Sequence, residues 1–89
     1  MIKITKVKVM VIKSDGEQGT KEIDGSLKSM QEIVGGLIEP VYLGHQVMIV
    51  DEEGLCKEKD VNPIASEIAG RTIVGDVFCI AREDWEALA

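Results

Sequence analysis

The stretch that decides the fold is "VMIVDEEGLCKEKDVNPIASEIAG", residues 47–70. Its four leading apolar residues predict a strand that is covered on both faces, and the acidic turn "DEEG" follows it. The charged segment "LCKEKD" fits either a short strand or a loop. Asn62 and Pro63 then predict a helix start, because Asn can accept bonds from free N–H groups and Pro fits the first helical position. A narrow apolar stripe and Gly70 predict a short helix over Pro63–Ala69.

The residues before this stretch predict a β-hairpin. Residues 37–43 and Gln46–Asp51 flank Gly44 and His45, a two-residue connection with glycine first, as a type II′ turn prefers. Pro40 has no N–H to donate to a neighbouring strand, so we expect the first of these strands at a sheet edge or a bulge. His45 is expected at the exposed tip as a polar turn residue, because a catalyst or ligand would need partners.

The N-terminal part of the chain predicts a first strand over residues 2–13. Its apolar alternation changes phase at Thr5 and Lys6, which indicates a bulge or a bend. Every residue of 9–12 is apolar, so a central position in the sheet is favoured. After a polar loop with several glycines, residues 20–23 could pair briefly with this first strand.

A helix is predicted over residues 26–34. Ser26 can cap it, and apolar residues then recur at i, i+3, i+6 and i+7 along one face. Gly35 and Gly36 end this helix, since glycine accepts the left-handed conformation of a C-terminal cap. A phosphate-binding loop would place its glycines before a helix rather than after one, so the pair is interpreted as a helix stop.

The end of the chain completes the expected fold. The run "TIVGDVFCIA", residues 72–81, is predicted as the last strand, and Gly75 and Asp76 interrupt it at a bulge or a close backbone approach. "REDWEALA" predicts a terminal helical turn or two. The fold class is therefore α+β: an antiparallel or mixed sheet of four or five strands, with the helices over residues 26–34 and 63–69 packed on one face.

Length and hydropathy indicate one soluble domain, residues 1–89. The chain has 89 residues, of which 45% are hydrophobic, and a net charge of −6, which fits one small globular unit. No apolar run approaches the roughly 20 residues of a membrane span, and lysines interrupt the start of the chain where a signal peptide would be apolar. We therefore expect a cytoplasmic protein without a membrane partner.

The charge distribution argues against a nucleic-acid partner. The first 13 residues carry four lysines and no acidic residue, so all 16 acidic residues lie beyond them. Lysines on a strand also protect a sheet edge from aggregation. A single-strand nucleic-acid surface combines a basic groove with stacking aromatics, and the chain has only one Trp, one Tyr and one Phe. Direct nucleic-acid binding is not expected.

The two cysteines fit neither a disulfide framework nor a paired zinc motif. Cys79 lies in the apolar run "VFCIA" and is expected to be buried as a small hydrophobic residue. Cys56 lies among charged residues and is expected to be exposed. No metal and no cofactor are expected from these residues.

The densest group of functional side chains is acidic and falls between residues 51 and 60. Its members are Asp51, Glu52, Glu53, Glu58 and Asp60. A calcium loop would place its glycine later and lie between two helices, and a glycosidase would need aromatic platforms around a carboxylate pair. Catalytic-triad, phosphate-loop and dinucleotide motifs are missing from the sequence, so an enzyme is not expected. The group is either a solvated bend or a partner-binding surface formed by Glu52, Glu53 and Glu58.

Four runs between residues 27 and 81 carry a family resemblance. They are "LKSMQEIVGGLIEPVYL", "VMIVDEEG", "VNPIASEIAG" and "TIVGDVFCIA". The positions on which it rests are mostly turns, caps and glycines: Gln31, Gly35, Gly36, Glu39, residues 51–54, Asn62, Pro63, Ala65 and residues 74–77. In this combination the chain resembles the domain-of-unknown-function family 3846. The resemblance implies a small α+β domain of phages, plasmids and related bacteria, with no agreed activity and no catalytic residues to carry over.

Two classes of function follow from these observations. The first is a non-enzymatic binding or regulatory domain of a phage or mobile genetic element. One version is an anti-defence protein whose acidic surface imitates nucleic-acid phosphates in the basic groove of a host nuclease. The alternative is a protein that binds or sequesters a nucleotide or metabolite, with a pocket at Asn62, Gly75 and Asp76 in a homodimer or larger assembly. An uncharacterised hydrolase comes last.

Overall fold

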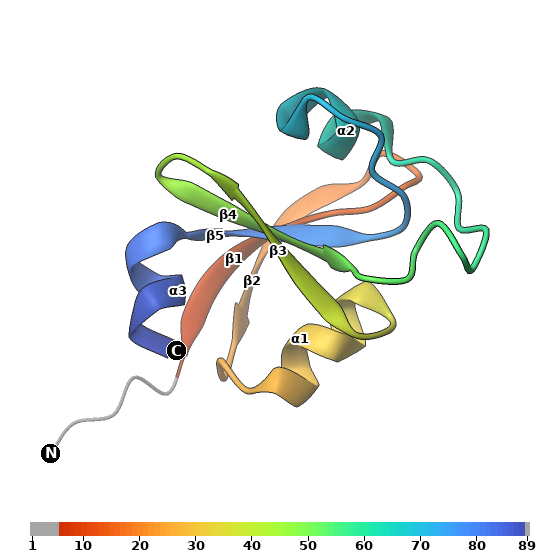
Figure 1. Ribbon diagram of the computed structural model, residues 1–89. Helices are drawn as coiled ribbons and strands as arrows, with labels where there is room; N and C mark the ends of the chain where they lie inside the picture. The colour runs from red at the N-terminus through yellow and green to blue at the C-terminus, as the bar shows by residue number, and fades with distance from the viewer. Residues whose placement is uncertain (1–5, 89) are drawn as a thin grey trace, which may run out of the picture.

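The computed structural model describes residues 6–88, which form a five-stranded antiparallel sheet and three helices (Figure 1). The elements are β1 (Val7–Ile12), β2 (Gln18–Ile23), α1 (Leu27–Val34), β3 (Ile38–Leu43), β4 (Gln46–Asp51), α2 (Pro63–Ala69), β5 (Val77–Ala81) and α3 (Arg82–Leu88). The strand order is β2-β1-β5-β4-β3. Two hairpins therefore lie on either side of β5, the last strand in the sequence. The predicted α+β class is confirmed.

Both hairpins have the expected pairing. β1 pairs with β2, and β3 pairs with β4. Pro40 lies on β3, an edge strand, where a missing N–H does not interrupt a ladder on the outer side. Gly44 has a φ of 76°, as a tight hairpin turn with glycine first requires. Residues 2–5 of the predicted first strand, and the change of phase at Thr5, lie outside the described residues.

The caps predicted for the first two helices are confirmed. The Ser26 side chain accepts a hydrogen bond from the N–H of Ser29 at the start of α1, and Gly35 closes that helix with a φ of 78°. At α2, the Asn62 side chain accepts from the N–H of Ala65. These caps are local features, which is why side-chain type and spacing suffice to predict them.

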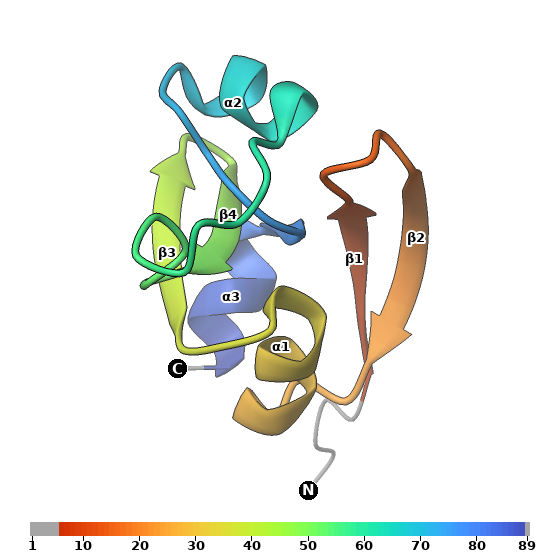
Figure 2. The ribbon, with the colours of Figure 1, turned by 90° about the vertical axis from the view of Figure 1, so that its right-hand side faces the viewer.

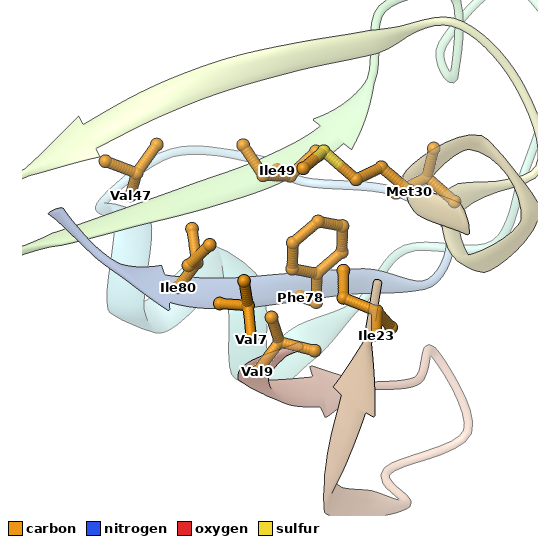
Figure 3. Close-up of a cluster of buried hydrophobic side chains, with 9 residues drawn as sticks. Val7, Val9, Ile23, Met30, Val47, Ile49, Phe78 and Ile80 are labelled. Atoms are coloured by element: carbon orange, nitrogen blue, oxygen red, sulfur yellow. The ribbon is translucent and has the colours of Figure 1, made fainter. Parts of the chain in front are cut away.

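One face of the sheet carries the larger hydrophobic cluster. Phe78 of β5 and Ile49 of β4 lie in it, and the Met30 side chain reaches them from α1 (Figure 3). Trp85 and Leu88 of α3 pack against the same cluster. The predicted terminal helix is thus held on the sheet by its two large apolar residues.

The opposite face is covered by α2, which corrects the expectation that the helices over residues 26–34 and 63–69 share one face. Ala65 of α2 belongs to a second cluster with Met48 and Cys79. The reason lies in β4 and β5, whose consecutive apolar residues point alternately to both faces. Each face therefore needs its own cover: α1 and α3 lie on the first face, and α2 lies on the second.

The segment before β5 is not a strand. Val74 makes only an isolated bridge with Val61, and the regular strand begins at Val77. Gly75 separates the two with a φ of 78°, as its expected role of interrupting the strand requires. The segment "LCKEKD" forms turns rather than a strand. Among residues 6–88, no helix is both long and apolar enough to cross a membrane.

The two cysteines should respond differently to replacement by serine. Cys79 is 7% exposed and packs in the second cluster, whereas Cys56 is exposed. We expect Cys79→Ser to lower the free energy of unfolding by about 1–3 kcal/mol, because a hydroxyl is buried among apolar neighbours. Cys56→Ser, the matched control, should leave it unchanged. Urea denaturation followed by circular dichroism measures both, and an equal loss in the two variants would contradict this assignment.

Candidate functional site

The acidic turn is built on a buried carboxylate, that of Asp51 at the end of β4. Its side chain is 0% exposed. Oδ2 lies 2.6 Å from Nζ of Lys59 and 3.0 Å from Nζ of Lys57, and Oδ1 accepts a hydrogen bond of 2.8 Å from the N–H of Glu53. The sequence grouped Asp51 with four other acids without distinguishing it, whereas the structure buries its side chain and pairs it with two lysines.

The same two lysines reach the C-terminal end of α1. Nζ of Lys59 donates to the carbonyl of Val34 at 2.7 Å, and Nζ of Lys57 donates to the carbonyl of Gly35 at 3.4 Å. Carbonyls at this end of a helix lack partners within it and carry partial negative charge, so ammonium groups stabilise them. The lysines therefore tie α1 to the loop of residues 52–60, which lies between α1 and α2 in front of β3 (Figure 2).

The surroundings of Asp51 lower its pKa to about 2. Burial alone would raise this pKa, because a charged carboxylate loses its hydration. Hydrogen bonds from Lys59, from the N–H of Glu53 and from Lys57 outweigh burial. The carboxylate therefore stays ionised over the whole physiological range, and we assign it to structure rather than to proton transfer.

Glycines of the family resemblance make room for this ion cluster. A Cβ atom at Gly36 would collide with Nζ of Lys57. A Cβ atom at Gly75 would lie 2.8 Å from Cδ of Lys59, a separation that real Cβ atoms do not show. At both positions the backbone approaches a lysine side chain closely, and at Gly75 the φ of 78° also favours glycine.

The exposed residues of the loop include two neighbouring acids and one leucine. Glu52 and Glu53 are exposed, and within residues 6–88 neither carboxylate has an ion pair or a hydrogen bond. Leu55 is 72% exposed, the highest value among the exposed large hydrophobic residues of the described chain. Glu58 is also exposed and adopts a left-handed backbone with a φ of 55°, which is uncommon for a residue other than glycine.

A small cleft, named here the loop cleft, opens beside Leu55. Its volume is about 210 Å³. It is lined by Glu39, Val50, Asp51, Glu52, Leu55, Cys56, Arg71, Thr72, Ile73 and Val74. Glu58 does not line it but faces a different hollow, beside α1. The structure therefore places Glu52 and Leu55 at one site and separates Glu58 from them.

Two adjoining hollows, named here the α1 grooves, run along α1. Their volumes are about 520 and 490 Å³, and both are lined by Glu32, Ile33 and Asp76. Asp76 is half-buried, and its Oδ1 accepts a hydrogen bond of 3.0 Å from the N–H of Ser14. Gly75 lines the second groove only. Of the residues predicted for a ligand pocket, Asp76 and Gly75 thus border a real hollow.

Asn62, the third residue predicted for that pocket, is fully buried and has no free hydrogen-bonding group. Its Nδ2 donates to the carbonyls of Ile12 and Gly75, both at 2.9 Å, and its Oδ1 accepts from the N–H of Ala65. These bonds use both N–H groups of the amide and join β1, α2 and the segment before β5. We therefore assign Asn62 to structure, beyond the helix cap that the sequence indicates.

His45 lines neither the loop cleft nor the α1 grooves. His45 is exposed at the tip of the β3–β4 hairpin, where its carbonyl accepts a hydrogen bond from the N–H of Arg82. In the part of the chain that the structure describes, no three His, Cys, Asp or Glu side chains are grouped so that they could hold a metal ion.

Sequence reasoning missed the residues that organise this site. Lys57 and Lys59 resemble solvated loop residues, and nothing in their spacing shows that they meet Asp51 and the end of α1. Leu55 did carry a signal, because it is the large apolar residue in an otherwise charged segment. A single apolar residue in a polar loop either packs beneath the loop or lies on the surface, where a partner can contact it. The exposed fraction of its side chain distinguishes the two cases.

Comparison with protein families gives a match over nearly the whole chain. The model of the family described as "Domain of unknown function (DUF3846)" matches residues 7–88, a longer range than the residues 27–81 of the resemblance. No curated protein and no solved structure matches the chain.

Stability should depend on pH through Asp51. The pKa of this carboxylate falls from 3.8 to about 2 on folding, so its stabilising effect is complete above about pH 5 and is lost progressively as the pH falls through 3.8 and then through about 2. We expect wild type to be more stable than Asp51→Asn at pH 7, by on the order of 2 kcal/mol or more. This difference should shrink between pH 4 and pH 2 in urea denaturation. A difference that does not change with pH would rule out the ionic role.

Replacing Asn62 should cost more than the loss of a helix cap. We expect Asn62→Ala to lower the free energy of unfolding by about 3 kcal/mol, since it removes a cap and leaves two buried carbonyls without this donor. Ser26→Ala, which removes the exposed cap of α1, should cost about 1 kcal/mol. Chemical denaturation compares the two. If Asn62→Ala is as stable as wild type but loses binding activity, Asn62 belongs to a binding site instead.

Proposed function

The chain belongs to the DUF3846 family, and since the description of that family assigns no activity, we propose a function from the surface geometry. We propose that this is a non-enzymatic binding domain that docks on a protein partner through the loop of residues 52–58. The observation that carries the proposal is the exposure of Leu55, 72%, on a loop that a buried ion cluster holds in place.

The ion cluster supports this proposal because a simple solvated bend needs neither a buried carboxylate nor lysine partners for it. Removing the Asp51 carboxylate from water carries a desolvation cost, which has to be offset by the two lysines and by the N–H of Glu53. A solvated turn has no need of such an anchor. A docking loop benefits from it, because a loop that is already ordered loses less conformational entropy on binding.

The charges on the loop indicate the kind of partner. Glu52 and Glu53 extend the excess of negative charge on a chain whose net charge is −6. A basic partner would be attracted over a distance set by ionic strength, and its association would be accelerated. We propose as the specific version an anti-defence protein of a phage or mobile genetic element that acts in the cytoplasm. Its acidic surface would bind the basic groove of a host nuclease.

Small-molecule binding is the second candidate, and the α1 grooves favour it. Their volumes of about 520 and 490 Å³ lie within the range of roughly 300–1,000 Å³ found for small-molecule sites. A nucleotide or metabolite bound there would contact Asp76. Mass spectrometry of the supernatant after denaturation of the purified protein tests this candidate, and a compound present in stoichiometric amount would support it.

Charge reversal on the loop tests the docking proposal. We expect Glu52→Lys with Glu53→Lys to leave the melting temperature nearly unchanged, because exposed charges contribute little to stability. The double variant should lose the basic proteins that wild type retains from a bacterial lysate. With one such partner purified, its association rate should fall several-fold at low salt and less at high salt.

The matched control is Glu22→Lys with Glu67→Lys, which makes the same change of charge at exposed positions on β2 and α2. This control should bind like wild type if the loop is the docking surface. Equal loss in both double variants would mean that only the net charge matters. Unchanged rates and melts in both would make the acidic turn a solvated bend.

A further inference from the structure

We infer that the loop cleft accepts one large apolar side chain of the partner, and that a basic residue flanks this side chain. The inference rests on the proposed docking function and deepens it, because it names the chemistry that the loop recognises. Three properties of the cleft carry it: its apolar floor, its charged rim and its fixed walls.

The floor of the loop cleft is apolar and its size fits a single side chain. Val50 is 5% exposed, Ile73 is 3% exposed and Val74 is 8% exposed, so each shows only a small apolar area at the bottom of the hollow. Leu55 adds an exposed apolar wall. A volume of about 210 Å³ has room for several waters and lies below the range of small-molecule sites. An apolar side chain would displace these waters favourably.

The rim of the cleft carries charge of both signs in unequal amounts. Glu39 and Glu52 line it, as does Arg71, and Glu53 lies next in the chain to Glu52. The carboxylates therefore outnumber the guanidinium around the opening. An apolar side chain with a lysine or arginine next to it meets complementary charge here, whereas the same side chain between acids would be repelled.

Both walls of the cleft are held in place without a ligand. On the loop side, a Cβ atom at Gly54 would lie 2.7 Å from Cγ2 of Val74, so only glycine lets the loop pack this closely. On the opposite side, the N–H of Ile73 donates to Oγ of Ser66 at 2.8 Å, and its carbonyl accepts from the N–H of Asn62 at 2.8 Å. A hollow with such walls exists before binding, which favours affinity.

Three capped pentapeptides, titrated into ¹⁵N-labelled protein, test this inference. The probe is Gly-Lys-Leu-Lys-Gly, and the matched peptides are Gly-Lys-Ala-Lys-Gly and Gly-Glu-Leu-Glu-Gly. We expect the probe to shift the amide signals of Leu55, Thr72 and Ile73 in a saturable way. The alanine peptide should bind about tenfold more weakly, because it buries less apolar area. The glutamate peptide should give no shift at these residues.

Variants of the protein distinguish the contribution of the cleft to peptide binding from that of the acidic surface. Leu55→Ala should melt like wild type and bind the leucine peptide several-fold more weakly, with the alanine peptide unaffected. Another outcome is that the leucine and alanine peptides bind wild type equally well, and that only the Glu52→Lys, Glu53→Lys variant fails to bind them. The acidic surface would then act alone, and the inference about the cleft would be overturned. No shift at the cleft up to the solubility limit of the leucine peptide also overturns it. Self-association that Leu55→Ala abolishes would identify a second copy as the occupant and overturn it as well.

Discussion

The ion pair between the Asp51 carboxylate and the Lys59 ammonium group joins the end of β4, the following loop and α1. The hydrogen bonds of the sheet alone do not connect these three segments. Asp51 ends β4, and Lys59 lies near the end of the following loop and also donates to the last turn of α1. One ion pair thus fixes the loop against a strand and a helix at once. Since the Asp51 side chain is buried, its replacement would remove the ion-pair partner of both lysines at once, whereas loss of Lys59 would leave the carboxylate paired with Lys57. The position of the exposed loop residues depends on this constraint.

Most of the fold could be predicted from sequence because most of its signals are local. Ser26 and Asn62 as caps, the Gly44 turn and the edge position of Pro40 all depend on a few neighbouring residues, and the structure confirms them. The assignment of helices to faces could not be predicted in this way. A strand such as β4 that is apolar on both faces requires cover on both sides, but it does not say which helix supplies which side.

The site was less predictable because it depends on contacts between distant residues. The sequence grouped five acids together, and the structure divides them into a buried anchor, an exposed pair and two residues beside α1. Lys57 and Lys59, which decide that division, lie in a charged segment where lysines are usually solvated. The two glycines that follow α1 illustrate the same limit. Their role in ending the helix is visible in sequence, whereas the room that Gly36 leaves for a lysine is not.

The strand order has a consequence for the way the chain is made. β5 lies at the centre of the sheet but is the last strand in the sequence, and it joins the β1–β2 and β3–β4 hairpins. During synthesis, both hairpins are translated before their common neighbour. An isolated two-stranded hairpin is marginally stable in water, so the nascent chain cannot close its core until β5 emerges. A stop codon upstream of β5 would therefore leave two unjoined hairpins with unpaired edges, open to aggregation and proteolysis.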